Sequence, residues 1–530
     1  MDSPHNPKLK SALIIGSCLV VAIFLGRMIG EEDHKRLLLG TVMVLGCSLW
    51  FFSGRFFWVL TIASSFLGGT FPILGGQFTP FQILMAMGLL KFVVEDVIFR
   101  RARLKLPGRF DLIMITGFMA VIVFHGVGDR FGMRFLGSTV WGGRQYVNIF
   151  VGLAAFFVIQ SIPKKPGLWA KFPYVVLAIA SFDLLVALVT TIAPFSIYYI
   201  YPFYSAVSMS SLQEAIGGSA DLTGRIGAFG NFGVLLMTLI FARISLRALL
   251  HPANFFRCLG LMAGGLAVLY SGYRSAVLNS FLLVVSAGIR DLKAGALVLL
   301  PIIAALFFAL SVVNSEVVTL PRQIQRALAF LPGDWDAQMA RDAAASNDFR
   351  VTIWTLWARE YFPNQAVFGR GFGFKSEWTK KSLYYGEGTD YRQMVETGNI
   401  HNGAIAAVDT FGILGTLFFA AWNISLLARA LRVSFDRRGG DYLALRFLAL
   451  YLAVSIVSYW IGSSSVGSFL PQQFALAGLF MRLRKDLQPS ESSPRPASYA
   501  AIDRNRLPRP VKQRRAPVAY RGNSEGSAQA

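Results

Sequence analysis

Residues 294–313 read AGALVLLPIIAALFFALSVV, a run of 20 positions without a charged side chain. Because a helix of about 20 residues spans the hydrocarbon core of a bilayer, this run predicts a transmembrane helix. Similar runs predict further spans, so we expect an all-α polytopic membrane protein with about 12–14 transmembrane helices. These runs lie near residues 10–26, 37–52, 56–75, 80–98, 112–127, 147–162, 173–194, 226–243, 255–272, 275–290, 401–428, 446–463 and 466–483.

Charged residues are scarce over the whole chain. They make up 15% of the 530 residues and apolar residues make up 54%, which is too little charge to cover a soluble domain of this size. The cysteines Cys18, Cys47 and Cys258 lie in apolar runs, so neither a disulfide framework nor a thiolate metal site is predicted. The first run has no small-x-small cleavage site after it, so we expect a retained anchor instead of a cleaved signal peptide.

The basic residues predict the orientation in the membrane. The formal net charge of +22 is concentrated in alternate short loops, at residues 100–105, 164–171, 243–257, 290–293 and 429–438. Short basic loops stay in the cytoplasm, so both termini are expected inside and residues 127–148, 193–225 and 313–400 outside. The dispersal of charge between spans suits anionic lipid headgroups and excludes the single basic patch of a nucleic-acid-binding protein.

The chain is expected to have four parts. Residues 1–312 form an N-terminal transmembrane bundle, residues 313–400 a large outer loop, and residues 401–483 the C-terminal transmembrane helices. The outer loop holds 10 Lys or Arg and 10 Asp or Glu, so it is neutral overall, unlike a disordered tail of like charge. Residues 484–530 are rich in Pro, Ser, Arg and Ala and predict a disordered, basic cytoplasmic tail.

An amphipathic helix is predicted inside the outer loop. Asn347 and Asp348 can cap a helix that begins near Phe349 and runs to Tyr361, and its aromatic face predicts a position on the membrane interface. Arg350 lies at the centre of that face, where it either binds an anion or carboxylate or reaches water from the first turn. The other residues of the face are Val351, Ile353, Trp354, Trp357 and Tyr361.

Three arginines run against the bias that places basic residues inside. Arg225 and Arg274 lie at the outer ends of spans, and Arg370 lies in the outer loop. A guanidinium offers paired donors that match a phosphate, so several arginines at one depth predict a site for a diphosphate-bearing lipid. Taken one at a time, each is equally compatible with an arginine that anchors the chain at the interface.

Glycines and aspartates near these arginines have plainer interpretations. Gly369, Gly371 and Gly373 flank Arg370 and predict a sharp turn, whose amides would be able to face an anion or simply close a loop. Asp183 and Asp409 fall within predicted spans, where a carboxylate is costly, and we expect both to be structural residues, for which an arginine of a neighbouring helix is one available partner.

His401 is the candidate base. It begins a predicted span directly after the polar outer loop, so its imidazole is reachable from both water and lipid and suits proton transfer near neutral pH. The alternative interpretation is an interfacial or helix-capping histidine, and His125, at another outer helix end, is the rival base. No second His, Cys or carboxylate stands at metal-ligand spacing from His401, so no metal site is predicted.

The same region resembles a known family. His401-Asn402, followed after nine residues by Gly412-Ile413-Leu414-Gly415-Thr416-Leu417, is similar to the signature of the O-antigen ligase family. Segments 225–231, 270–276 and 350–373 also resemble segments of that family in kind, order and spacing, so that the resemblance covers residues 223–417. Related O-antigen polymerases and protein O-oligosaccharyltransferases share much of this pattern.

The resemblance implies a metal-independent, inverting glycosyltransferase of the bacterial inner membrane that needs no nucleotide or other cofactor. It would take an oligo- or polysaccharide from a polyprenyl diphosphate, with Arg225, Arg274 and Arg350 binding the diphosphate and Arg370 as a further candidate. His401 would take the proton of the acceptor hydroxyl. The acceptor remains open between a lipid A core sugar, another lipid-linked repeat and a protein hydroxyl.

Two other classes of function are considered. A flippase or transporter of lipid-linked sugars would also need a basic outer rim, but transporters place polar groups near the bilayer midplane in repeated halves. The arginines here are expected at the outer surface and the sequence holds no evident repeat, which favours the enzyme. A structural protein of an envelope assembly is the third alternative.

Overall fold

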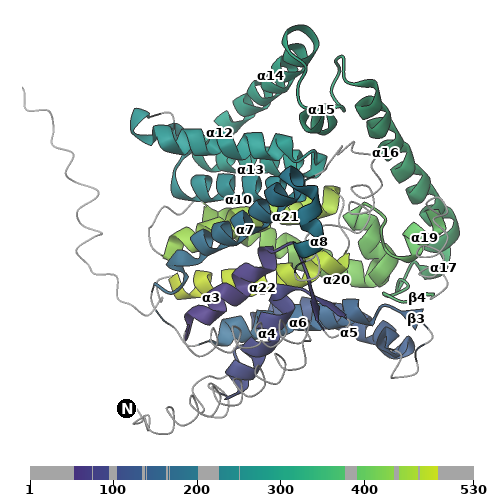
Figure 1. The fold of residues 1–530 in the computed structure, drawn as a ribbon. Helices are drawn as coiled ribbons and strands as arrows, with labels where there is room; N and C mark the ends of the chain where they lie inside the picture. Colours follow the sequence, from purple (N-terminus) through teal and green to yellow (C-terminus); the bar gives the residue numbers. More distant parts are fainter. Residues whose placement is uncertain are drawn as a thin grey trace, which may run out of the picture. The chain divides into compact units, whose positions relative to one another are not determined.

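The computed structural model describes residues 53–73, 76–94, 104–133, 138, 140–162, 165, 167–200, 204, 226–249, 251–375, 391–434, 441–462 and 466–487. All of these up to Asp486 belong to one compact unit. Figure 1 shows a helical bundle, and short strands appear only as two antiparallel pairs in the described ranges, β1 with β2 and β3 with β4. The predicted spans at 10–26 and 37–52, Arg225 and residues 488–530 lie outside the described residues.

The elements follow one another in this order: α3 Phe56–Ala63, β1 Phe71–Ile73, β2 Gly76–Phe78, α4 Pro80–Lys91, α5 Arg109–Gly128, β3 Val140–Trp141, α6 Gly143–Ser161, α7 Phe172–Ile192, α8 Ile197–Ile200, α10 Gly227–Arg243, α11 Leu246–Leu249, α12 Phe255–Tyr270, α13 Arg274–Leu292, α14 Leu299–Val312, α15 Arg322–Leu328, α16 Ala337–Leu356, α17 Phe362–Gln365, β4 Phe374–Lys375, α19 Tyr391–Glu396, α20 Gly403–Ser434, α21 Asp441–Ile461 and α22 Val466–Leu487.

The helices confirm an all-α polytopic membrane protein. Among the described residues, seven helices are long and apolar enough to cross a bilayer, and three shorter apolar helices accompany them. The seven are Arg109–Gly128, Trp169–Ile192, Pro252–Tyr270, Arg274–Leu292, Gly295–Val317, Gly403–Val433 and Asp441–Ile461. The total of 12–14 spans stays a prediction, because the first two predicted spans are outside the described part of the chain.

Two predicted boundaries differ from the structure. The run predicted as one span at 56–75 is helical only to Phe66, after which Gly68 and Gly69 lead into the β1–β2 pair. The outer loop was predicted from residue 313, but a π-helical segment, Val313–Val317, continues α14 by more than a turn. Apolar composition extends beyond the helix in the first case and stops short of it in the second, so it does not mark either helix end.

Aromatic side chains fill the centre of the bundle between α5, α6, α20 and α22. The ring of Phe118 on α5 lies 4.7 Å from that of Phe411 and 5.2 Å from that of Phe419, both on α20. Trp422 of α20 stacks on Phe474 of α22 with ring centroids 5.0 Å apart. These five residues are almost fully buried, and such ring pairs add directional packing where helices have no hydrophobic drive to associate within lipid.

Two buried carboxylates of the bundle, Asp111 and Asp183, have partners on other elements. Arg429 of α20 donates to both carboxylate oxygens of Asp111 on α5, with Nη1 2.7 Å from Oδ2. Asp183 of α7 accepts from the hydroxyl of Tyr204 and from the amide of Gly68 at 2.7 Å. A phenol and a turn amide, and not an arginine, therefore partner the Asp183 carboxylate.

Helix α20 is broken at Gly412, where φ is 65° and ψ is −177°. A broken helix in a membrane must find new partners for the backbone groups that it frees. Here the loop formed by residues 366–371 provides them, as the loop packs into the break. The four bonds are Arg370 N to Asp409 O (2.9 Å), Gly371 N to Thr410 O (3.0 Å), Ile413 N to Ala366 O (2.7 Å) and Leu414 N to Val367 O (3.1 Å).

Gly412→Ala should lower the free energy of unfolding by at least about 2 kcal/mol, measured by thermal unfolding in detergent. A Cβ at this position would lie 2.2 Å from the carbonyl oxygen of Val367, and its backbone angle is one that L side chains rarely adopt. The control is Gly265→Ala on α12, where a Cβ meets nothing within 4 Å, so stability should stay unchanged or rise by up to about 1 kcal/mol. Equal effects of the two substitutions would contradict the role of the break.

Candidate active site

His401 lies just outside the start of α20. The helix begins at Gly403, and the side-chain oxygen of Asn402 accepts from the amides of Ala404 (3.0 Å) and Ile405 (3.1 Å). Asn402 is thus the helix cap, and the prediction that His401 itself opens the helix is off by two residues. His401 has φ of 56°, the left-handed helical (αL) region, which is an uncommon backbone state for a residue with a side chain.

Helix α16 begins earlier than predicted. Its N-cap is Asp336, whose carboxylate accepts from the amides of Gln338 (2.9 Å) and Met339 (3.2 Å). Asn347 and Asp348 therefore lie inside the helix, and the prediction that they cap it is wrong. The alanine-rich residues 337–346 have high helix propensity, so the helix extends over them and begins before Asn347.

The aromatic face of α16 packs on the segment that carries His401. The indole of Trp354 donates to the carbonyl of Ile400 at 3.0 Å, and that of Trp357 donates to the carboxylate of Asp409 at 3.0 Å. Ile353 is fully buried, whereas Val351 is 58% exposed and does not join this contact. Part of the predicted face thus binds protein instead of lipid, and the position of α16 on the membrane interface stays a prediction.

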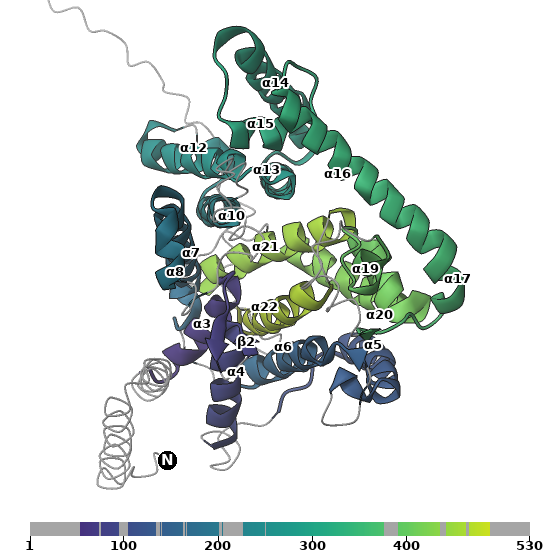
Figure 2. The same cartoon turned by 45° about the vertical axis from the view of Figure 1, so that its right-hand side comes forward.

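Arg274 and His401 both contact α16, at residues two positions apart. Arg274, the first residue of α13, lies 3.5 Å from the side-chain oxygen of Asn347 through Nη1. Two residues further along α16, the ring of Phe349 packs edge-on against the ring of His401, with centroids 5.9 Å apart. Figure 2 shows α16 running from near α14 and α15 to α17, with α19 and α20 beside its far end. Two predicted site residues, 127 positions apart in the sequence, therefore meet the same turn of α16.

Arg350 lies between these two contacts. At about 100° per residue, its position on the helix is about 60° from Asn347 and about 100° from Phe349. Its side chain is half-buried, so it neither points freely into water nor is enclosed. Asn347 and Phe349, which contact Arg274 and His401, thus lie about 160° apart around α16, with Arg350 between them. Arg274, Arg350 and His401 surround one turn of α16, and their convergence on one site stays a prediction.

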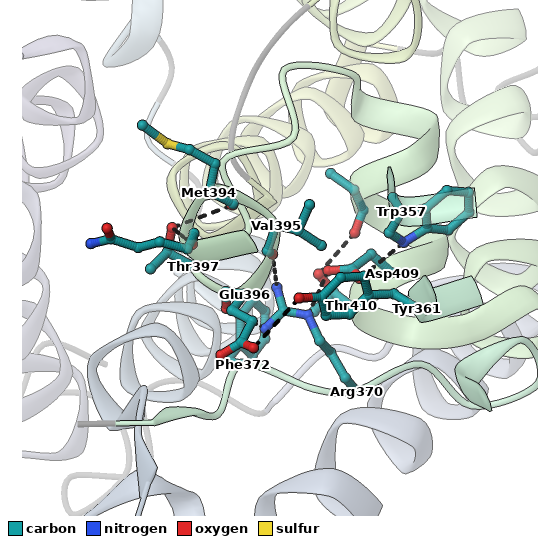
Figure 3. Close-up of polar contacts among 12 residues, drawn as sticks. Trp357, Tyr361, Arg370, Phe372, Met394, Val395, Glu396, Thr397, Asp409 and Thr410 are labelled. Atoms are coloured by element: carbon teal, nitrogen blue, oxygen red, sulfur yellow. Dashed lines mark hydrogen bonds and ion pairs between the residues drawn. The ribbon is translucent and has the colours of Figure 1, made fainter. Parts of the chain in front are cut away.

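Arg370 is directed elsewhere. Its Nε lies 2.7 Å from the carboxylate of Asp409, Nη2 donates to the carbonyl of Val395 at 2.8 Å, and Nη1 donates to the carbonyl of Glu396. The Arg370 side chain is 11% exposed and that of Asp409 is 0% exposed (Figure 3). The partner of Asp409 is thus an arginine, which comes from the loop and not from a neighbouring helix.

The glycines around Arg370 close a turn. The amide of Gly369 donates to Gln365, and the amides of Arg370 and Gly371 donate into the break of α20. Gly369 and Gly371 have φ of 77° and 73°. These three amides are engaged within the protein, so they support the loop interpretation and not an anion-binding turn.

His125, the rival base, faces the same loop. Its Nε2 lies 2.6 Å from the carbonyl oxygen of Phe368, a contact that requires Nε2 to donate. That nitrogen cannot accept a proton while the contact holds. Burial raises the pKa of the nearby Asp129 carboxyl, and the charge of His125 opposes this rise. The structure therefore places His125 against loop 366–371, whereas His401 is placed against α16.

Tyr361 ends the π-helical segment Trp357–Tyr361 that follows α16. Its hydroxyl lies 3.5 Å from the carboxylate of Glu396. Burial, together with the charge of Glu396, raises the pKa of Tyr361 to about 12, so the phenol stays neutral. Within the described ranges, no group of three or more His, Cys, Asp or Glu is arranged to hold a metal ion.

The contacts that build the site were not predicted from the sequence. Asn347, Phe349 and Trp354 were named only as parts of an amphipathic helix, and nothing in their spacing relates them to Arg274, His401 and Ile400. Asn402 carried the one available signal, since an Asn directly before Gly403 and an apolar run is typical of a helix cap.

The comparison with known families agrees with this region. Residues 259–420 match a family model described as O-Antigen ligase, and this range contains Arg274, Arg350, Arg370 and His401. The match confirms the resemblance inferred from the sequence. No curated protein matches the chain.

The left-handed backbone of His401 predicts that glycine is more stable than alanine at this position, the reverse of the order found in helices. His401→Gly should be more stable than His401→Ala by about 1 kcal/mol in thermal unfolding, because both lose the ring but only glycine adopts a positive φ without strain. In an ordinary helix the alanine variant is the more stable one. A more stable His401→Ala would contradict the strained backbone at this position.

Proposed function

We propose that this multi-pass membrane protein with an O-antigen ligase domain transfers a glycan from polyprenyl diphosphate to an acceptor hydroxyl. The reaction takes place at the outer face of the bacterial inner membrane, with both termini in the cytoplasm. The observation that carries the proposal is that α16 joins Arg274 and His401 through Asn347 and Phe349, inside the matched segment.

The arginines handle the diphosphate. Arg274 and Arg350, with Arg225 from outside the described residues, bind the diphosphate oxygens and stabilise the negative charge that grows as the bond to the sugar breaks. Arg274 is the first residue of α13, where the helix dipole favours an anion. Fixed donors of this kind need no metal ion to balance the charge of the leaving group.

His401 handles the proton. The acceptor oxygen attacks the anomeric carbon from the side opposite the diphosphate, the carbon–oxygen bond to the diphosphate breaks, and His401 takes the proton of the acceptor hydroxyl. The contact with Phe349 and the αL backbone fix the direction of the imidazole. The configuration at the anomeric carbon is inverted, because a single displacement occurs.

The break in α20 bears on the transporter alternative. Broken helices in transporters leave backbone groups free to bind substrate or ions. Asp409 O, Thr410 O, Ile413 N and Leu414 N around Gly412 all bond to loop 366–371. These four groups are thus used to hold the loop, unlike the substrate-binding breaks of transporters, which favours the transferase.

His401→Ala should abolish transfer from purified polyprenyl-diphosphate glycan to acceptor and leave the protein inserted and abundant, because the proton then has no acceptor. His251→Ala is the control, since His251 is exposed and only caps a short turn, and its activity should equal that of the wild type. The wild-type activity should also survive a chelator. Substantial activity of His401→Ala would exclude this mechanism. So would a loss of wild-type activity in the chelator that a divalent ion restores.

The glycan products of a deletion strain distinguish a ligase from a polymerase. A deletion strain that carries His401→Ala should accumulate long, unligated chains if the protein is a ligase. Single-repeat products would identify it as a polymerase instead.

Arg274→Lys should lose most of the activity, about 100-fold, although the charge is kept. An ammonium cannot reproduce the paired donation of a guanidinium to a diphosphate. The measurement is the same transfer assay, with Arg257→Lys as control, because the Arg257 side chain bonds only to its neighbour Asn254 in the described contacts. Transfer by Arg274→Lys within a few-fold of the wild type would assign Arg274 to an anchoring role.

A further inference from the structure

Asp409 is a junction of three segments that are remote in sequence. It belongs to α20, its Oδ1 accepts from the indole of Trp357 at 3.0 Å, and its Oδ2 accepts from Nε of Arg370 at 2.7 Å. The Asp409 side chain has no exposed surface, although it lies in a membrane-spanning helix. A carboxylate at such a depth is strongly unfavourable unless it is paired, so these two partners are required for the site to hold together.

Arg370 extends this junction to the chain just before His401. Its two terminal nitrogens donate to the carbonyls of Val395 and Glu396, at the C-terminal end of α19, where a cation is favoured (Figure 3). Gly398 then passes over the guanidinium, and a Cβ there would lie 3.6 Å from Nη2. Arg370 therefore holds the segment five residues before His401.

The other end of this segment is held by α16. Ile400 is fully buried, and its carbonyl accepts from Trp354 at 3.0 Å, one turn of helix before Trp357. Residues 395–401 are thus fixed by Arg370 at one end and by α16 at the other, and both attachments lead back to Asp409. The backbone of His401 keeps its strained angle between them.

We propose that Arg370 and Asp409, here called the Arg370–Asp409 clamp, are positioning residues that hold His401 and α16 in register, and that Arg370 is not a ligand of the diphosphate. This inference rests on the proposed function. Three of the five N–H groups of the Arg370 guanidinium donate within the protein, and the side chain is only 11% exposed, so little of it is open to a diphosphate. Displacement of a reacting group by about 1 Å can reduce the rate of a reaction about 100-fold.

The clamp is tested with the double variant Arg370→Gln/Asp409→Asn. Removal of only one partner would leave a buried charge and risk loss of the fold, whereas paired amides keep the site polar and neutral. The matched control is Arg429→Gln/Asp111→Asn, which makes the same changes in the other ion pair of α20, more than 25 residues from His401. Both proteins are purified in full length and compared with the wild type.

Two readouts are measured. The clamp variant should show kcat lowered about 100-fold, with the KM for the polyprenyl-diphosphate donor within about twofold of the wild type. Trypsin should also cleave it after Arg392, an exposed residue of α19, at least about fivefold faster, because α19 is released. The control should keep the kcat, KM and cleavage rate of the wild type.

The outcomes that would overturn the proposal are distinct. A raised KM with unchanged kcat would make Arg370 a donor ligand, and unchanged cleavage after Arg392 would show that the clamp does not hold α19. An equal loss of kcat in the control variant would show that the loss comes from general destabilisation of the protein and not from the Arg370–Asp409 clamp. If wild-type protein shows no transfer but the clamp variant is cleaved faster, the proposed function fails and the clamp itself is supported.

Discussion

The hydrogen bonding of the backbone inside a membrane constrains this structure more than any side-chain contact. Helix α20 is interrupted at Gly412, and its four freed groups pair with loop 366–371. Because lipid offers no replacement partners, the loop cannot leave the break without cost. The loop therefore has a fixed place, and with it Arg370, whose amide and side chain both reach Asp409. The outer loop is thus tied to a transmembrane helix at one defined point.

From that point the site is arranged through α16. Trp357 binds Asp409, Trp354 binds the carbonyl before His401, and the helix continues to Asn347, which meets Arg274. One rigid element consequently relates the proposed base to the proposed diphosphate ligand. A rigid helix defines such distances better than a loop does, which suits a reaction that depends on the position of fixed donors.

The buried charges show three ways to place a carboxylate in a membrane protein. Asp111 has a bidentate arginine, Asp183 has a phenol and a turn amide, and Asp409 has an arginine and an indole. Each solution joins separate elements, because a buried carboxylate has more acceptor sites than its own helix can fill. Of the three, only the partners of Asp409 extend to the segment with His401. The same electrostatic requirement therefore joins elements of the bundle in two cases and, in the third, also fixes the segment that carries the proposed base.

The sequence by itself determined the membrane class, most span positions and the family resemblance, because length, hydropathy and local residue order carry that information. It also singled out Arg274, Arg350 and His401 as candidate site residues. It further indicated an arginine as one available partner of Asp409. Only the structure decided that this arginine is Arg370, that Asp336 and not Asn347 caps α16, and that Asn402 caps α20. The two caps are local choices among polar residues that are able to cap a helix, whereas the arginine is set by a contact 39 residues away, whose geometry depends on the completed packing and leaves no periodic signal in the chain.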